Sequence, residues 1–302
     1  MIPLVEIFCV IDDFCKQFEN ELSKYLLDAP KKKKRKKRKD SQMRLSEVMT
    51  ILVMFHYSHY RTFKDFYLNC IMENHKRDFP QAVSYNRFVE LMPMTFMPFF
   101  VLIAALPGKE TGKYFIDATK LPVCHNLRIA RHKVFKGLAK RGKTSTGWFF
   151  GFKLHLIFNE QGELMRFDLT PGNIDDRSVV ERMVKNLSGW LFGDRGYISQ
   201  KLNQTLADKG LELITKVKKN MKEKIIGPIK EHYLNKRGMI ETIIDQLKNL
   251  LQIDHSRHRS PINFQINILG GIVAYIFKPR KVNVPFHALN LLGSQNLQIT
   301  PN

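Results

Sequence analysis

Three acidic residues stand where a carboxylate could do chemistry. Asp117 lies inside the strand-like run KYFIDATK, where an ionised acid is costly to bury unless it is paired or binds a metal ion. Asp194 follows the apolar run GWLFG, and an acid at the carboxyl end of a strand sits where open α/β sheets bind ligands. Glu241 lies in the helix-like stretch 233–248. With no Cys or His motif nearby, three converging carboxylates suit hard divalent cations such as Mg²⁺. Two such ions can clamp both oxygens of a phosphodiester displacement.

The stretch 233–248 predicts one amphipathic helix. At about 100° per residue, a polar arc holds Arg237, Glu241, Asp245 and Lys248. A second arc, able to face a core, holds Met239, Ile240, Ile243, Ile244, Leu247, Leu250 and Leu251. Taken alone, the polar arc is more typical of a solvated face with ion pairs between residues four apart, and the two acids upstream change this interpretation.

The elements around these acids alternate in type. Two strands, at 147–158 and 163–169, follow the first acid and pair through the turn 159–162. Asp175 or Asp176 then opens a helix, and the strand before Asp194, another helix, and a strand at 211–217 complete the series. This order predicts an α/β domain with a mixed central sheet flanked by helices.

Charge points to a polyanionic partner. The chain has 302 residues and a net charge of +21, of which Lys31–Lys39 supply nine, so +12 remains on the rest. Nucleic acid is the first partner this suggests and an anionic membrane the second. We expect the basic tract 31–40 to be disordered; it could attract phosphates, solubilise the chain or act as a nuclear-localisation signal.

The first 107 residues predict a basic, all-helical module. Helices are expected at 5–27 and 45–70, and Ser84 is expected to cap a short helix that exposes Asn86 and Arg87. That short helix resembles the second half of a helix-turn-helix, although ordinary helix packing explains it as well. The apolar run 91–106 has sixteen residues, fewer than the roughly 20 of a membrane span, and predicts a core helix.

Six ordered blocks carry a family resemblance: FIDATKLPVCHNLRI, GFKLHLIFNEQGEL, LTPGNIDDRSV, FGDRGYIS, RGMIETIIDQLKN and HSRHRSPINFQINILGGIVAYI. They resemble bacterial insertion-sequence DDE transposases, closest to the insertion-sequence family designated 982. The resemblance implies an RNase H-like core in which Asp117, Asp194 and Glu241 bind Mg²⁺ or Mn²⁺. It implies that Arg237 and Lys248 hold transposon-end DNA. Tyr233 sits one residue too far from Arg237 for the family spacing.

The expected function is therefore a DNA transposase that cuts the ends of its element and joins their 3′-hydroxyls to target DNA. The alternatives are a catalytically inactive or co-opted DNA-binding derivative, and a metal-dependent nuclease of the same fold. Expected partners are the terminal inverted repeats, target DNA and a second copy of the chain, in the bacterial cytoplasm at the nucleoid and without a membrane.

The expected domains are a DNA-binding module at 1–107, the catalytic domain at 108–260, and a C-terminal helix and tail at 261–302 that pack on the core. Arg257 and Arg259 form either a DNA-facing turn or simply an exposed one.

Several further residues have two readings each. Lys153 and His155 either point toward the acids or belong to a strand buried on one face. Asn173, Asp175 and Asp176 could cap a helix or bind a metal ion, and capping is the favoured interpretation. Trp148 and Trp190 could pack in the core or stack on DNA bases, and the core position is the favoured interpretation.

Overall fold

The computed structural model describes residues 3–27, 43–216, 226–254 and 258–283, so the basic tract 31–40 and Arg257 lie outside the described residues. The chain forms two compact units. One holds Met1–Leu106 with Gln246–Pro279, and the other holds Pro107–Asp245 with Arg280–Asn302. Residues 246–260, which the sequence assigned to the catalytic domain, thus group with the helices. One reason is that the carbonyl oxygen of Leu251 in this segment lies 2.5 Å from Nδ1 of His56, in the helix Leu45–Tyr57.

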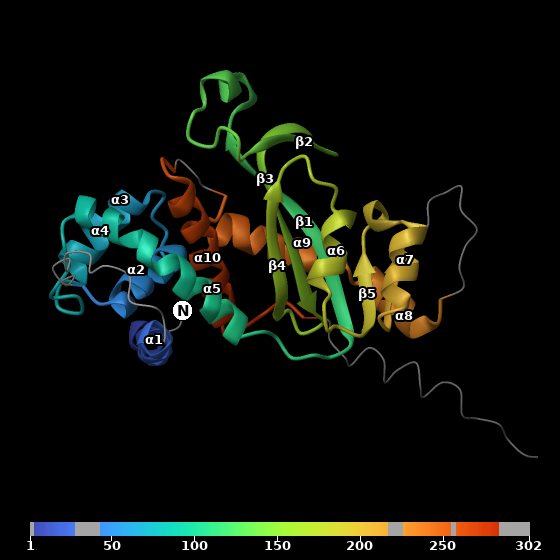
Figure 1. Ribbon diagram of the computed structural model, residues 1–302, viewed down its shortest axis with the longest axis horizontal. Helices are drawn as coiled ribbons and strands as arrows, with labels where there is room; N and C mark the ends of the chain where they lie inside the picture. Colours follow the sequence, from blue (N-terminus) through green and yellow to red (C-terminus); the bar gives the residue numbers. More distant parts are fainter. Residues whose placement is uncertain (1–2, 28–42, 217–225, 255–257, 284–302) are drawn as a thin grey trace, which may run out of the picture. The chain divides into compact units, whose positions relative to one another are not determined.

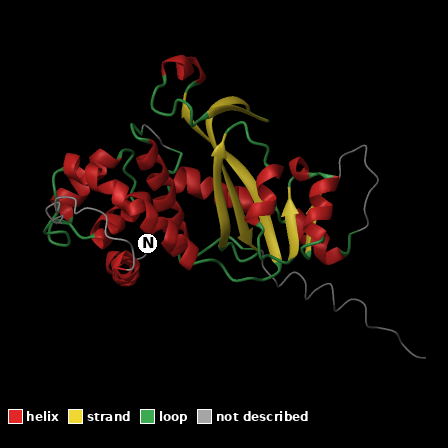
Figure 2. Ribbon diagram, viewed as in Figure 1, coloured by secondary structure: helices red, strands yellow, loops and turns green. Residues whose placement is uncertain are grey.

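The first unit is helical (Figure 2). Its elements are α1 (Leu4–Leu27), α2 (Leu45–Tyr57), α3 (Phe63–Asp65), the π-helix η1 (Phe66–Asn74), α4 (Tyr85–Leu91), the 3₁₀ turn η2 (Met92–Thr95), α5 (Phe96–Ala105), the π-helix η5 (Gln246–Leu250) and α10 (Pro261–Phe277). Helix α10 packs on α2 and α5, and α1 packs on α2. The helix predicted at 45–70 is interrupted because Ser58 turns to extended backbone and its N–H closes α2 onto Met54 and Phe55.

The apolar run before residue 107 is a broken helix. Ser84 caps α4 as predicted, accepting from the Arg87 N–H at 3.4 Å. From Tyr85 to Ala105 the chain is long and apolar enough to cross a membrane by length and composition. A 3₁₀ turn containing Pro93 interrupts this run, and α5 buries Phe99, Leu102 and Ile103. Its packing on α10 is that of a core helix.

The second unit is built on a six-stranded mixed sheet (Figure 1). Its strands are β1 (Lys113–Cys124), β2 (Lys140–Thr144), β3 (Gly147–Asn159), β4 (Leu164–Pro171), β5 (Gly189–Gly193) and β6 (Leu211–Thr215). The order is β2-β3-β1-β5-β6, with β4 also on β3. Strands β1 to β4 pair antiparallel, whereas β5 pairs parallel with both β1 and β6.

Helices cover both faces of this sheet. The helical elements of this unit are η3 (Asn126–Arg131), α6 (Arg177–Met183), η4 (Arg195–Tyr197), α7 (Gln200–Ala207), α8 (Pro228–Asn235) and α9 (Gly238–Asp245). On one face, Ile116 and Leu191 share a core with Val179 and Val180 of α6. On the other face, the rings of Phe115 and Phe192 lie 5.4 Å apart and pack on Tyr233 of α8. We call these the α6 face and the α9 face.

The single helix predicted at 233–248 is wrong. Helix α8 ends at Asn235, a turn at Lys236–Arg237 follows, and α9 begins at Gly238. The π-helical hydrogen bonds of η5 then widen the turn and shift the helical phase, so Leu250 is exposed although the regular period predicted it buried. Tyr233 belongs to α8 and is a buried core residue.

Candidate active site

The first two acids are brought together by strand register. Strands β1 and β5 are parallel neighbours, and Phe115 pairs with Phe192. Asp117 and Asp194 each follow their phenylalanine by two residues. Side chains two residues apart on a strand share a face, so both acids extend from the α9 face, side by side, where β5 ends. The tripeptides Phe-Ile-Asp and Phe-Gly-Asp carried this signal in the sequence.

Asp117 is held in a poorly solvated position. Its carboxylate accepts from the Ala118 N–H at 2.8 Å, and the side chain is 22% exposed. Burial raises its pKa to about 6; the Ala118 N–H and the Arg237 guanidinium oppose this shift, while the negative charges of Asp194 and Glu241 add to it. The three predicted acids are therefore close enough to interact electrostatically. A cation placed among them would favour ionised Asp117.

Asp194 lies at the mouth of the same region. It follows β5 with extended backbone, and its carboxylate accepts from the Gly196 N–H as the cap of η4. The residue is exposed, and Tyr197, one turn on, is buried. This short cap fixes the direction of a carboxylate that remains open to solvent on its other side.

Glu241 comes from α9, which packs on β1. Its Oε1 accepts from Arg237 Nη2 at 2.8 Å, and Arg237 Nη1 lies 3.9 Å from Asp117 Oδ2. Arg237 Nη1 is buried and has no hydrogen-bond partner among the described residues. The break between α8 and α9 places this guanidinium between two of the acids, so Arg237 offsets part of their charge.

The donor set suits a hard cation, although its present arrangement is not that of a closed metal site. All three side chains offer carboxylate oxygens, the ligands that Mg²⁺ and Mn²⁺ prefer. Within the described ranges, no three His, Cys, Asp or Glu side chains stand close enough together to hold one ion. The Arg237–Glu241 ion pair accounts for part of this, because it turns Glu241 toward the guanidinium. Glu241 is 61% exposed, which leaves its side chain room to change rotamer.

The other residues predicted to bind DNA lie in the helical unit. Asn86 and Arg87 are exposed in the first turn of α4, and Arg87 pairs with Glu90 at 2.7 Å. Lys248 pairs with Asp254 at 3.0 Å, and Arg259 is exposed before α10. Arg237 is thus the one predicted DNA contact that the structure places in the same unit as the acids.

Lys153 and His155 do not point toward the acids. In an antiparallel pair, residues directly opposite share a face, and His155 lies opposite Ala118 while Asp117 lies opposite Leu156. Both side chains therefore belong to the α6 face. There Lys153 Nζ lies 2.9 Å from Asp176 Oδ1, and His155 Nε2 lies 2.9 Å from Thr170 Oγ1.

Comparison with known proteins decides the family. Residues 107–261, just over half of the chain and containing all three acids, match the family described as Transposase DDE domain. The chain belongs to this family. Membership implies transposase catalysis and, with the mixed sheet, confirms the predicted RNase H-like α/β fold.

A solved piggyBac transposase synaptic complex with hairpin DNA is similar in structure, with 12% identity and a TM-score of 0.48 over 94% of this chain and 78% of that chain. No curated protein matches the sequence.

Proposed function

We propose that this DDE transposase is encoded by an insertion sequence, as in the family designated 982, and that it cuts the element's ends and joins their 3′-hydroxyls to target DNA. The observation that supports this most is the alignment of Asp117 with Asp194 through the Phe115–Phe192 pair, with Glu241 on the same face. These three acids would hold two Mg²⁺ or Mn²⁺ ions. When bound, such ions polarise the scissile phosphodiester and supply an activated water molecule.

The chain's own residues have separable tasks in this proposal. Asp117, inside β1, and Asp194, at the end of β5, would offer oxygens from fixed backbone positions, whereas Glu241 would exchange its contact with Arg237 for one with the ion. Arg237 is then free to pair with a phosphate of the element end. The net charge of +21 draws both DNA molecules to the protein through counterion release.

The reaction implies two kinds of partner, DNA and a second copy of the chain. Joining both ends of an element in concert requires at least a dimer in the active complex, assembled on the terminal inverted repeats and the target. We place this complex in the bacterial cytoplasm, at the nucleoid.

A strand-transfer assay on the full chain tests the proposal, using the DNA that flanks its gene as substrate. Asp117→Asn, Asp194→Asn and Glu241→Gln should each lower transfer by at least roughly 10²–10³-fold, while DNA binding persists. Glu181→Gln is the matched control, because this α6 acid is exposed and pairs with Lys209 on the other face. Full transfer by any of the three variants would contradict the assignment. Cleavage without joining would identify a nuclease, and binding alone an inactive derivative.

A second pair of variants tests the choice of third acid. Asp245 lies one helical turn beyond Glu241 on α9. Glu241→Gln should abolish transfer, whereas Asp245→Asn should retain most of it. The reverse result would identify Asp245 as the third metal ligand and would exclude Glu241.

A further inference from the structure

An exposed tryptophan lies beside two cations on the hairpin formed by β2 and β3. The sequence favoured a core position for Trp148, yet it is 61% exposed. Lys143 pairs with it across the strands, and Lys143 Nζ lies 5.7 Å from the centre of its ring. Arg141, two residues before Lys143 on β2, extends from the same face of the hairpin. Exposing an indole costs hydrophobic free energy that a stacked partner would recover.

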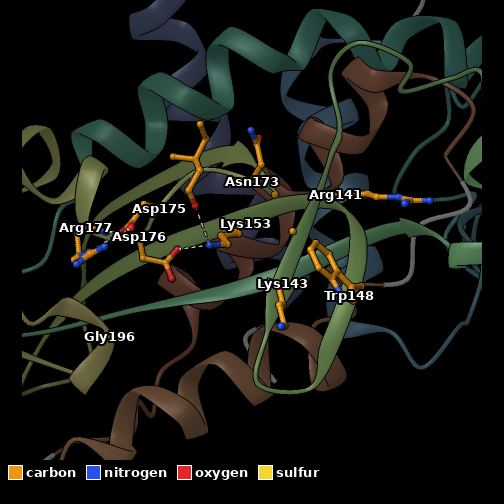
Figure 3. Close-up of a pocket in the computed structure, with 12 residues that line it drawn as sticks. Arg141, Lys143, Trp148, Lys153, Asn173, Asp175, Asp176, Arg177 and Gly196 are labelled. Atoms are coloured by element: carbon orange, nitrogen blue, oxygen red, sulfur yellow. Dashed lines mark hydrogen bonds and ion pairs between the residues drawn. The ribbon is translucent and has the colours of Figure 1, made fainter. Parts of the chain in front are cut away.

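These three residues are on one wall of an open cavity of about 440 Å³, and the Arg141 side chain extends away from the acids of the opposite wall (Figure 3). Asn173, Asp175 and Asp176 line it from the segment between β4 and α6, and Gly196 lies at its edge. Lys153 and Arg177, also at this cavity, are already paired with Asp176 and Asp175. In contrast, neither Arg141 nor Lys143 has an ion-pair partner in the part of the chain that the structure describes. The hairpin wall is therefore the positively charged one.

The segment leading into this hairpin is basic throughout. No Asp or Glu occurs between Asp117 and Glu160. The 3₁₀ turn η3 and the loop after it expose Arg128, Arg131, Lys133 and Lys136. In Figure 1 this segment and β2 project from one end of the sheet. A basic projection without acids is suited to a nucleic-acid backbone.

The hairpin itself is firmly anchored. A Cβ on Gly142 would lie 2.1 Å from the Gly172 carbonyl oxygen and 2.6 Å from the Phe149 ring, so β2 sits directly against the end of β4. Phe149 is buried beneath it. Because the adjoining backbone is close-packed, Trp148 is displayed from a defined position.

We propose that Trp148 stacks on an unpaired base of the DNA, while Arg141 and Lys143 neutralise the phosphates beside that base. This site rests on the proposed function, since it takes the same DNA, but it lies on residues other than the three acids. Aromatic stacking of this kind tolerates any base, because every base has a π face. An unpaired base arises wherever a duplex end is opened or a strand is cut.

Fluorescence tests the site directly, because the chain has two tryptophans. Trp190→Phe leaves Trp148 as the single reporter. Binding of a single-stranded oligo-dT in EDTA should quench its emission, and anisotropy of labelled oligo-dT should report affinity in parallel. Trp148→Ala should weaken oligo-dT binding on the order of tenfold, and Trp148→Phe should restore most of the loss. Lys143→Ala should reduce the salt dependence by about one phosphate contact.

The control is Leu127→Ala, which removes another exposed apolar side chain, 87% exposed, from the same projection and should leave affinity unchanged. If DNA binds without quenching, or if Trp148→Ala binds as wild type, the stacking site is wrong while the transposase proposal stands. If the unaltered chain fails to bind oligo-dT, the stacking site is again wrong. Neither of these results would imply a loss of strand transfer. The stacking site and the transposase activity can therefore be disproved independently.

Discussion

The two faces of the sheet carry acids in different electrostatic states. On the α6 face each of four acids has its own cation at 2.5–2.9 Å: Asp168 with Arg182, Asp175 with Arg177, Asp176 with Lys153, and Glu181 with Lys209. On the α9 face, Arg237 pairs with Glu241 and lies near Asp117, while Asp194 accepts only a backbone N–H among its described contacts.

This difference separates structural acids from candidate ligands. From the sequence, the Asp175-Asp176 pair is expected to cap a helix, with cation binding as the alternative. The structure shows its charge balanced within the protein, and Arg177 lowers the Asp175 pKa to about 2. Asp117 instead has a raised pKa, because burial and two neighbouring acids disfavour its charge. Acids that the protein leaves unbalanced are those that an external cation would stabilise.

The largest effect on stability is expected on the balanced face. Asp176→Ala would remove the partner of Lys153, whose side chain is only 12% exposed. An ammonium left without its carboxylate in this position should lower the free energy of unfolding by roughly 2–3 kcal/mol. Urea unfolding at neutral pH measures this. Lys153→Met with Asp176→Ala should recover part of the loss, and an unchanged midpoint in the single variant would show that the pair contributes little.

A change of opposite sign is expected on the unbalanced face. In metal-free buffer, Asp117→Asn should raise the free energy of unfolding at pH 7 by on the order of 1–2 kcal/mol. Between about pH 4 and pH 6 the unfolded chain releases a proton that folded Asp117 retains. The free energy of unfolding of the unaltered protein therefore falls as the pH rises through that window, and the asparagine variant avoids this loss. Unfolding curves at pH 4 and pH 7 should show no gain at the lower pH; an equal gain at both would exclude the ionisation as its cause.

The smallest effect is expected for the exposed pair. Asp175 and Arg177 have side chains 52% and 45% exposed, so Asp175→Ala should cost at most about 1 kcal/mol, including its contact with the Arg177 N–H. Because the Asp175 pKa is lowered, this contribution is present above about pH 4 and is lost as pH falls toward 2. Thermal unfolding at pH 7 and pH 3 checks both statements. If Asp175→Ala lowered the free energy of unfolding as much as Asp176→Ala, the exposed pair would be as stabilising as the more buried one, contrary to expectation.

Much of the sheet was predictable from local pattern. The strands of the catalytic unit that contain long apolar runs were predicted near their observed bounds, because those runs are bracketed by turn residues. The hairpin strand β2 was missed: KRGKT is polar, and it forms because Gly142 permits close approach to Gly172. The separation of α8 from α9 was missed as well, because the apolar residues before and after Lys236 and Arg237 keep the spacing of one continuous helix.

The three acids could be chosen from the sequence, but their electrostatic environment could not. Strand type and position pointed to Asp117 and Asp194, and the Phe-x-Asp repeat could also have indicated their shared register. The face on which Lys153 lies depends on how β3 pairs with β1, a long-range property that no short stretch encodes. The pairing of Asp176 with Lys153 across 23 residues is of the same kind.

Binding of Mn²⁺ tests the central claim most directly. Electron paramagnetic resonance of free Mn²⁺, titrated into the full chain with bound DNA, measures the ion's affinity without requiring turnover. We expect Asp117→Asn to weaken Mn²⁺ binding by roughly tenfold or more, whereas Asp175→Asn should leave it unchanged. Unchanged affinity in Asp117→Asn, or a loss confined to Asp175→Asn, would contradict the assignment of the cation to the α9 face.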